Sequence, residues 1–287
     1  MLSTFFIDTL QIHGGGQSNF FLNDVQGLDS PDIRLSSYDK PGETGAVVSA
    51  EQYGARPLTL VGTVAGSDIA TYLAARRALS YACRVRHDSS GLVSGVPLTF
   101  STLDGATYSV TGYIKPPFRC SGPLPTSAPF QISFICPDPA LYGSSLQTTG
   151  QISIASGGGF TFPATFPITF GAGTGGSGTL NNAGTMDTWP IVYLRGALTN
   201  PRIYSVERAA ALKLNYTTTN VTDVIAIDMK NKTIMLNGVT NLLTYRDTAE
   251  RSWFSLPPAS NTILFGTTSA GDTGTMEVTA YPASLSV

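Results

Sequence analysis

The stretch RPLTLVGTVAGSDIATYLAARRALSYAC, residues 56–83, decides the fold class of the N-terminal half. In its first part, Leu58 and Leu60 stand two positions apart among β-type residues, which predicts a strand with one buried face. With Ser67 as N-cap and Asp68 at the positive end of the helix dipole, a helix is predicted from Ser67 to about Cys83. The apolar residues that recur at helical spacing in it are Ile69, Tyr72, Leu73, Leu79 and Cys83.

Strand patterns return after this helix. Residues 96–100, 108–113 and 130–136 are rich in β-branched and aromatic residues, and the last of these segments alternates clearly. We expect them to pair as an antiparallel sheet, of which one helix can cover only a part. The N-terminal half is therefore predicted to be a β-sandwich or split barrel with one packed helix. Arg76 and Arg77 are expected to lay their aliphatic stems along the border of the helix's apolar stripe.

A change of pattern at residues 136–143 marks the predicted domain junction. Pro137 and Pro139 block ladder hydrogen bonds and bias their neighbours to extended conformations. We place the junction near residue 143, which gives an N-terminal domain of residues 1–143 and a C-terminal domain of residues 144–287. Beyond the junction, residues 160–170 combine aromatic residues with prolines and suit edge strands, and residues 171–178 form a glycine-rich loop.

The C-terminal half contains many short strand patterns and no convincing helix. Asn237-Gly238 is the strongest short hairpin-turn signal in the chain. Strands separated by turn residues at fairly even spacing predict a second all-β sandwich, so the whole chain is predicted to be mainly β. The strands are expected near residues 191–195, 224–228, 233–236, 263–265 and 276–280.

The composition agrees with a folded β protein and argues against several classes of function. Hydrophobic residues make up 42% and charged residues 13%, with 30 Gly and 18 Pro, which suits short strands joined by tight turns. A formal net charge of -2, with no run of Lys and Arg, gives no basic patch for specific nucleic-acid binding. No stretch approaches the ~20 apolar residues of a membrane-spanning helix. Residues 1–8 lack a basic leader, so neither secretion nor membrane insertion is expected.

The three cysteines, Cys83, Cys120 and Cys136, are sparse and odd in number. A disulfide scaffold would carry more cysteines, in even number. We expect reduced, packed thiols and synthesis in a reducing cytoplasm.

Residues for catalysis are few. A serine nucleophile needs an adjacent base, but His13 precedes a glycine turn and His87 follows the helix, neither of them in a motif. No Gly-x-Ser-x-Gly elbow occurs. Gly171, Gly173 and Gly176 satisfy Gly-x-Gly-x-x-Gly in letters alone, because no helix pattern follows them. We therefore predict no catalytic residue and no cofactor-binding site.

Metal and paired-carboxylate chemistry have equally little support. None of the cysteines has a Cys or His partner at zinc-ligand spacing, so no metal site is predicted. A glycosidase needs two carboxylates across a cleft, for which Asp223, Asp228 and Asp247 can be nominated. Asp228 more simply caps a strand before its turn, and nothing in the sequence selects a pair.

Ordered strings along nearly the whole chain resemble the distal tail protein family of siphophages. In the N-terminal half they are residues 27–31, 41–45, 53–62 and 136–139 with Tyr142. In the C-terminal half they are residues 188–190, 200–203, 227–228, 232–238, 252–258 and 261–263 with Gly196.

The resemblance implies a structural protein of the virion, at the distal end of the phage tail. It implies a homohexameric ring built by the N-terminal domains, with a galectin-like β-sandwich projecting from each subunit. The implied partners are the tail tube protein, the tail hub protein and the tape-measure protein. DNA would pass through the ring with only transient, unspecific contact, which suits the near-neutral charge. Residues 29–50, a long loop with a Pro41-Gly42 turn, are expected to reach a neighbouring subunit.

Two other functions remain open from the residues. A carbohydrate-binding or receptor-binding module is the main alternative, with Trp189 and Trp253 as candidates for stacking on sugars. Their apolar neighbours favour packing at strand ends instead. Hydrolysis of the cell wall ranks third, because the metal ligands or paired acids it needs are not evident. From residue 189 onward the sequence has no room for an inserted receptor module.

Overall fold

The computed structural model describes residues 2–14, 16, 19–122, 125–154, 176–269 and 271–287. The chain divides into two compact units. The N-terminal unit contains the residues up to Ser144 together with Ser284–Val287, and the C-terminal unit is Ser145–Ala283. The edge strands predicted at 160–170 and most of the glycine-rich loop, with Gly171 and Gly173, lie outside the described residues.

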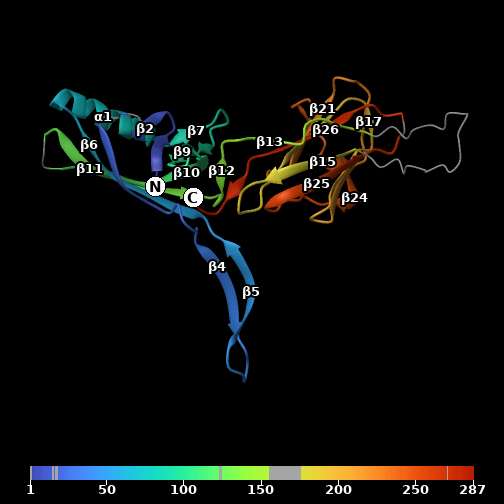
Figure 1. Cartoon of the computed structure of the whole chain (residues 1–287), viewed down its shortest axis with the longest axis horizontal. Coiled ribbons are helices and arrows are strands. Elements are labelled where there is room, and N and C mark those ends of the chain that lie inside the picture. Colours follow the sequence, from blue (N-terminus) through green and yellow to red (C-terminus); the bar gives the residue numbers. More distant parts are fainter. Residues whose placement is uncertain (1, 15, 17–18, 123–124, 155–175, 270) are drawn as a thin grey trace, which may run out of the picture. The chain divides into compact units, whose positions relative to one another are not determined.

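A strongly alternating strand organises the N-terminal unit (Figure 1). β6 (Arg56–Ala65) buries every second side chain and lies between β11 and β3, as its sequence pattern predicts. The strand order of the sheet is β2-β1-β9-β10-β11-β6-β3. The other strands are β1 (Leu2–Ile7), β2 (Leu10–His13), β3 (Phe20–Gln26), β9 (Val96–Thr102), β10 (Thr107–Cys120), β11 (Ser127–Cys136) and β12 (Leu141–Gly143). A short ladder joins β7 (Arg86–His87) and β8 (Val93–Ser94).

The helix α1 (Ile69–Ala82) is confirmed, but its first turn differs from the prediction. Asp68, not Ser67, is the N-cap: its Oδ1 accepts the backbone N–H of Thr71 at 2.8 Å. Ser67 donates to the Asp68 carboxylate instead. A carboxylate accepts the amide and also complements the helix dipole, so Asp68 serves both purposes. These hydrogen bonds, first of all that from Thr71, lower the pKa of Asp68.

The helix buries Tyr72, Ala75, Leu79 and Ala82 against the sheet. Ile69 and Leu73, which the predicted stripe included, are 56% and 37% exposed. Ile69 lies in the first turn of the helix. Leu73 directly follows the buried Tyr72, and successive residues of a helix are rotated by about 100°, so its side chain points away from the buried face. The buried face is therefore narrower than the sequence indicated. Arg76 and Arg77 are exposed.

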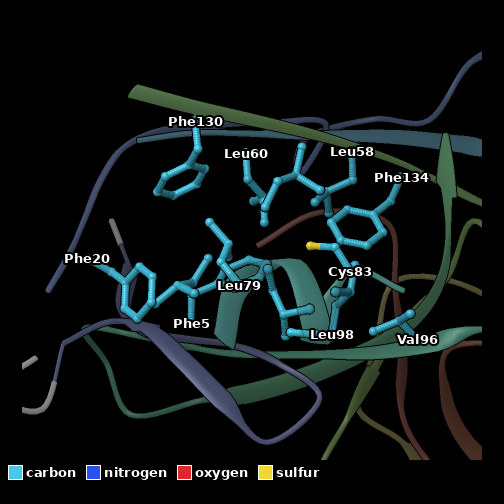
Figure 2. Packing of buried hydrophobic residues seen from close by; sticks show 14 of the residues in the cluster. Phe5, Phe20, Leu58, Leu60, Leu79, Cys83, Val96, Leu98, Phe130 and Phe134 are labelled. Atoms are coloured by element: carbon cyan, nitrogen blue, oxygen red, sulfur yellow. The ribbon is translucent and has the colours of Figure 1, made fainter. Parts of the chain in front are cut away.

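Aromatic and aliphatic side chains from the strands and from α1 fill the N-terminal core (Figure 2). Phe5 and Phe100 stack with ring centroids 5.6 Å apart, and Leu79 of the helix lies among Leu58 and Leu60 of β6. Each fully buried side chain of this kind contributes about 1.5–3 kcal/mol. The core therefore holds one face of β6 and one face of α1 together.

All three cysteines are free and buried in this unit. Burial raises the pKa of the Cys83 thiol to about 12 and that of Cys136 to about 11, and it also raises the pKa of Cys120. A buried neutral thiol is a poor nucleophile. The thiols should therefore react with a thiol reagent only when this unit opens.

The C-terminal unit is all-β, as predicted. A seven-stranded sheet has the strand order β13-β26-β16-β21-β22-β23, with β14 beside β26, and a five-stranded sheet has the order β15-β25-β18-β19-β24. The predicted strands at 191–195, 224–228 and 233–236 are β16 (Ile191–Arg195), β21 (Val224–Asp228) and β22 (Thr233–Leu236). Asn237 and Gly238 both have positive φ in the turn after β22, which confirms the hairpin signal.

The remaining elements of this unit are short. They are β13 (Gln147–Thr148), β14 (Ile152–Ser153), β15 (Ser177–Asn182), β17 (Leu198–Thr199), β18 (Arg202–Ser205), β19 (Ala210–Leu214), β20 (Thr217–Thr218), β23 (Thr240–Asn241), the 3-10 helix η1 (Leu243–Tyr245), β24 (Arg246–Arg251), β25 (Ala259–Gly266) and β26 (Thr275–Ala280). The last strand, β27 (Ala283–Ser284), pairs with β12 in the first sheet. Within the described part of the chain, no helix combines the length and the apolar character needed to cross a membrane.

Candidate functional site

Two surface features stand out, and the first is a hairpin that the sequence indicated only as a long loop. β4 (Ile33–Asp39) and β5 (Ala46–Tyr53) pair with each other and, among the described residues, with no other strand (Figure 1). Every side chain of β4 is exposed, and nearly every one of β5. An isolated two-stranded hairpin is marginally stable in water. We call residues 33–53 the arm.

One face of the arm is apolar. The strand register places Ile33 opposite Tyr53 and Leu35 opposite Glu51, and Val48 lies further along, opposite Ser37. Adjacent residues of a strand point to opposite faces, and Ile33, Leu35 and Ser37 alternate along β4. A register shift between Ser36 and Ser37 brings Val48 opposite Ser37, so these side chains share one face. Four of them, Ile33, Leu35, Val48 and Tyr53, are 52%, 58%, 56% and 47% exposed. We call this set the apolar stripe. Contiguous exposed apolar side chains of this kind mark interaction surfaces.

A buried arginine anchors the base of the arm. Arg56, three residues after β5, is 0% exposed, and its guanidinium donates only to backbone carbonyls among the described residues. Nη1 donates to the carbonyls of Gly27 at 2.6 Å and Asp29 at 3.2 Å, which lie in the segment between β3 and the arm. Nε reaches Pro139 at 2.8 Å, and Nη2 reaches Leu285 at 2.5 Å. Arg56 therefore ties together three separate segments of the N-terminal unit.

The surroundings of Arg56 are closely fitted. Desolvation lowers the pKa of the guanidinium, and the nearby carboxylates of Asp29 and Asp138 oppose this shift. Gly27 has φ +96, and a Cβ atom there would come within 1.9 Å of the Pro57 carbonyl oxygen. Only glycine can therefore present its carbonyl to Arg56 in this conformation.

The second feature is a groove on the outer face of the five-stranded sheet, lined by both apolar and charged residues, among them Leu264, Arg202 and Glu250. Its volume is ≈ 550 Å³. The register aligns Gly266 of β25, Arg202 of β18 and Lys213 of β19 in one row across the sheet. Their neighbours Ile203, Leu212 and Phe265 point the other way into the core. We call the cavity lined by Asn200, Arg202, Lys213, Glu250, Gly266 and Thr268 the groove.

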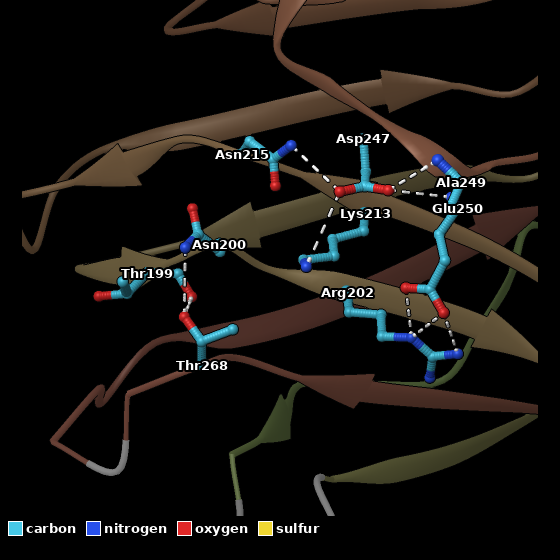
Figure 3. Close-up of polar contacts among 9 residues, drawn as sticks. All are labelled: Thr199, Asn200, Arg202, Lys213, Asn215, Asp247, Ala249, Glu250 and Thr268. Carbon is cyan, nitrogen blue, oxygen red and sulfur yellow. Dashed lines mark hydrogen bonds and ion pairs between the residues drawn. The ribbon is translucent and has the colours of Figure 1, made fainter.

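An arginine–carboxylate pair forms the centre of the groove (Figure 3). Glu250 Oε1 accepts from Arg202 Nε at 2.9 Å and from Nη2 at 2.7 Å, while Oε2 accepts from Nε at 2.8 Å. These hydrogen bonds lower the pKa of Glu250 and raise that of Arg202. Both groups are therefore ionised at neutral pH.

Hydrogen bonds made by Asp247 and Asn200 hold the other segments that line the groove. Asp247 Oδ1 accepts the backbone N–H groups of Ala249 at 2.8 Å and Glu250 at 3.1 Å, which fixes the turn that presents Glu250. Its other oxygen, Oδ2, accepts from Asn215 at 3.1 Å and lies 3.8 Å from Lys213 Nζ (Figure 3). Backbone hydrogen bonds are the first cause of the lowered pKa of Asp247. At the opposite end, Asn200 with φ 50 donates from Nδ2 to Thr268 Oγ1 at 3.3 Å.

Replacing Glu250 with glutamine should lower the free energy of unfolding of the C-terminal unit by about 1 kcal/mol at neutral pH, because a partly exposed guanidinium loses its charged partner. Since folding lowers the pKa of Glu250, its contribution is complete above the ordinary value of 4.5. It is lost as the pH falls through the lower folded value, so the difference from the wild type should close in acid. Trp189 and Trp253 both lie in this unit, and tryptophan fluorescence during urea unfolding measures the effect.

Glu51→Gln is the matched control, because it removes an exposed carboxylate in the other unit. It should leave the tryptophan transition unchanged. A stability difference for Glu250→Gln that stays constant down to strongly acidic pH would contradict this account of the ion pair.

The residues nominated from sequence do not form one site. Asp228 Oδ1 accepts the backbone N–H groups of Lys230 and Asn231, so it caps its turn as expected. Asp223 accepts from Asn220 and Asn237 at another turn, and Asp247 alone lies beside the groove. Trp253 packs against the C-terminal core, and Trp189 is 37% exposed; neither tryptophan lines the groove.

The two histidines lie at the ends of short strands. His13 ends β2, and His87 ends β7. Within the described residues, no group of His, Cys, Asp and Glu could hold a metal ion. The absence of catalytic, cofactor and metal sites stays a prediction.

Sequence reasoning missed the groove as a site. Arg202 and Glu250 are 48 positions apart, and neither stands in a catalytic or ligand-binding motif. Their meeting depends on the pairing of β19 with β18 and on the bulge between β19 and β24. No local signal could have found it.

The two units define a class of protein: a mainly β chain with an exposed hairpin on one unit and a two-sheet unit following it. Residues 183–280 match the family model of the siphovirus-type tail component, C-terminal domain. Over these residues the chain is similar to that family, and the resemblance to siphophage distal tail proteins is confirmed. The chain is accordingly a component of the phage tail. A search of curated proteins gave no match.

Solved structures show the same fold over nearly the whole chain. The crystal structure of the Dit protein of phage SPP1, described as a paradigm of the hub adsorption apparatus in phages that infect Gram-positive hosts, aligns with a TM-score of 0.66. The alignment has 18% identity and covers 96% of this chain and 97% of that one. A structure of the phage P2 baseplate in its activated conformation aligns with a TM-score of 0.50 at 10% identity, covering 93% and 91%. The predicted mainly β fold with a galectin-like C-terminal sandwich is thus confirmed.

Proposed function

We propose that this chain is the distal tail protein of a siphophage and that it assembles into a closed homohexameric ring. The ring joins the tail tube to the tail hub, and its channel passes the tape-measure protein and then DNA. The observation that carries the proposal is the apolar stripe of the arm, exposed in the single chain. The family match over residues 183–280 and the shared fold with a phage hub protein support it.

The arm suits docking onto a second copy of the same chain. Its stripe needs an apolar partner, and the edges of its two strands still carry unpaired backbone groups. A cyclic ring gives every subunit one donor arm and one acceptor surface, so every stripe is covered and no open end remains. Since the arm belongs to the N-terminal unit, we assign ring formation to that unit. The C-terminal unit then serves as a peripheral docking surface.

We assign no catalytic step to the chain. The three aspartates that the sequence nominated are engaged in separate turns, which supports a structural role. The formal net charge of -2 suits a channel that must release DNA, because a strongly basic lining would retain it.

Negative-stain electron microscopy of the purified full chain tests the proposal. We expect rings with sixfold symmetry and a central opening, and a mass of six chains by light scattering. A chain that stays monomeric at every concentration would contradict self-assembly. Closed rings of another subunit number would correct the stoichiometry alone.

A further inference from the structure

We propose that the groove of the C-terminal unit is a binding site for a neutral saccharide. This inference goes beyond the proposed role in the ring and does not depend on it. A volume of ≈ 550 Å³ falls within the range of roughly 300–1,000 Å³ typical of small-ligand sites. The groove is open to solvent along one side of the sheet, so part of a longer chain could lie in it.

The groove alternates hydrogen-bond donors and acceptors at close range. Arg202 and Lys213 supply donors, Glu250 supplies carboxylate acceptors, and the hydroxyl of Thr268 and the amide of Asn200 can do both. Among the described residues, Nη1 of Arg202 has no acceptor, and Lys213 Nζ has only the Asp247 oxygen at 3.8 Å. A sugar hydroxyl donates one hydrogen bond and accepts others. It can therefore bridge Arg202 and Glu250 at once.

The charge of the groove favours a neutral ligand. Arg202 and Lys213 carry positive charge, and Glu250 and Asp247 carry negative charge, so the formal sum is zero. An anionic ligand such as a phosphate or a uronic acid would need a cation not already neutralised. The bidentate pair of Arg202 with Glu250 removes that cation. The ligand should therefore be rich in hydroxyl groups and carry no charge.

The site is formed before any ligand arrives. Asp247 fixes the backbone of Glu250, Glu250 fixes Arg202, and Asn200 is held by its own backbone N–H to the Tyr216 carbonyl at 3.0 Å. A site whose side chains are already ordered loses less entropy on binding. Phe265 belongs to the lining but is buried, with its side chain in the core, so it offers no ring face to a sugar. Binding should therefore be weak, with a Kd of roughly 1 mM.

Gly266 gives a way to close the groove without disturbing the sheet. It lies in the same row as Arg202 and Lys213, and a Cβ atom built there meets no heavy atom within 4 Å. Its φ is not positive, so a larger residue can adopt the same backbone conformation. A tryptophan at this position should fill the floor of the groove.

The test is a glycan array of neutral and acidic saccharides with the full-length chain, followed by titration with each neutral disaccharide that binds. We expect the wild type to retain at least one neutral saccharide, and Gly266→Trp to lose the binding. Glu250→Gln should weaken it by at least about tenfold, because one acceptor is lost and Arg202 is released. Val239→Trp is the matched control: Val239 is 82% exposed and follows β22 in the other sheet. It should bind like the wild type.

Three results would overturn the proposal. The first is an array on which no neutral saccharide binds the wild type. The second is saccharide binding that persists in Gly266→Trp, when tryptophan fluorescence during urea unfolding shows that Gly266→Trp and Val239→Trp are both folded. The third is a preference for acidic saccharides that weakens with added salt, which would assign the groove to an anion.

Discussion

Replacing Arg56 with methionine should lower the free energy of unfolding of the N-terminal unit by about 3–5 kcal/mol. The substitution keeps most of the apolar volume but removes the only described donor that links the carbonyls of Gly27, Asp29, Pro139 and Leu285. Buried carbonyls left without a donor each cost about 1–3 kcal/mol, although water can reach some of them once the segments separate. The loss of the buried charge itself returns part of this cost.

The chain provides a separate probe for each unit. All three cysteines lie in the N-terminal unit, and both tryptophans lie in the C-terminal unit. The rate of thiol labelling in urea therefore reports opening of the first unit, and tryptophan fluorescence reports the second. We expect Arg56→Met to shift the labelling transition strongly and the fluorescence transition little. Equal shifts of both transitions would show that the units unfold together.

Arg56→Lys is the control for charge. Lysine keeps a buried cation but presents one ammonium group in place of the planar fork, so it can reach only some of the four carbonyls. Its stability should fall between the wild type and Arg56→Met. A lysine variant as stable as the wild type would show that charge alone, without the fork geometry, holds the three segments.

The elements that sequence predicted well are those whose own residues carry the pattern. β6 and α1 follow one another in a single stretch; β6 buries the face that its period indicates, and α1 buries a narrower part of its predicted apolar stripe. β21 and β22 lie on either side of a turn that begins after Asp228, and the Asn237-Gly238 turn follows β22. The residue types of both turns indicate them in the sequence. Local periodicity is enough in these places because one face of each element is buried within the same unit.

The failures come from contacts between distant segments or from surfaces whose partner is outside the chain. The arm was expected as a loop, because neither face of the hairpin is buried in the single chain and the Pro41-Gly42 turn dominates the local pattern. Leu285 joins the N-terminal unit through Arg56 at a separation of 229 positions, which no local pattern reports. The groove likewise depends on strand register, which sequence periods do not determine across different hairpins.

The arm also shows why burial in a single subunit is an incomplete guide. Of the large apolar side chains exposed on the N-terminal unit, several cluster on this one hairpin, while β6 beside it follows a regular inside and outside pattern. A ribbon that is apolar on one face and alone in solution is stabilised when a second surface covers it. The pattern on the arm therefore describes the assembly better than it describes the monomer.

Replacing Leu35 with lysine should weaken self-association by at least about 100-fold, because an apolar contact is lost and a charged side chain would have to be desolvated in the subunit contact. The introduced ammonium group would stand opposite Glu51 in the hairpin, and this cross-strand pair should keep the arm folded in the monomer. Ser36→Lys is the matched control, since the adjacent residue points to the opposite face of the ribbon and carries the same new charge.

Mass measurement by light scattering over a range of protein concentrations distinguishes the two variants. We expect Leu35→Lys to remain monomeric where the wild type and Ser36→Lys form rings, with unchanged thiol labelling in all three as a check on folding. The two variants place the same charge one position apart on the same strand, on opposite faces of the arm. A difference in their assembly therefore shows that the apolar face makes the subunit contact. If both variants assemble like the wild type, the apolar stripe is not the contact and ring formation must use another surface of the N-terminal unit.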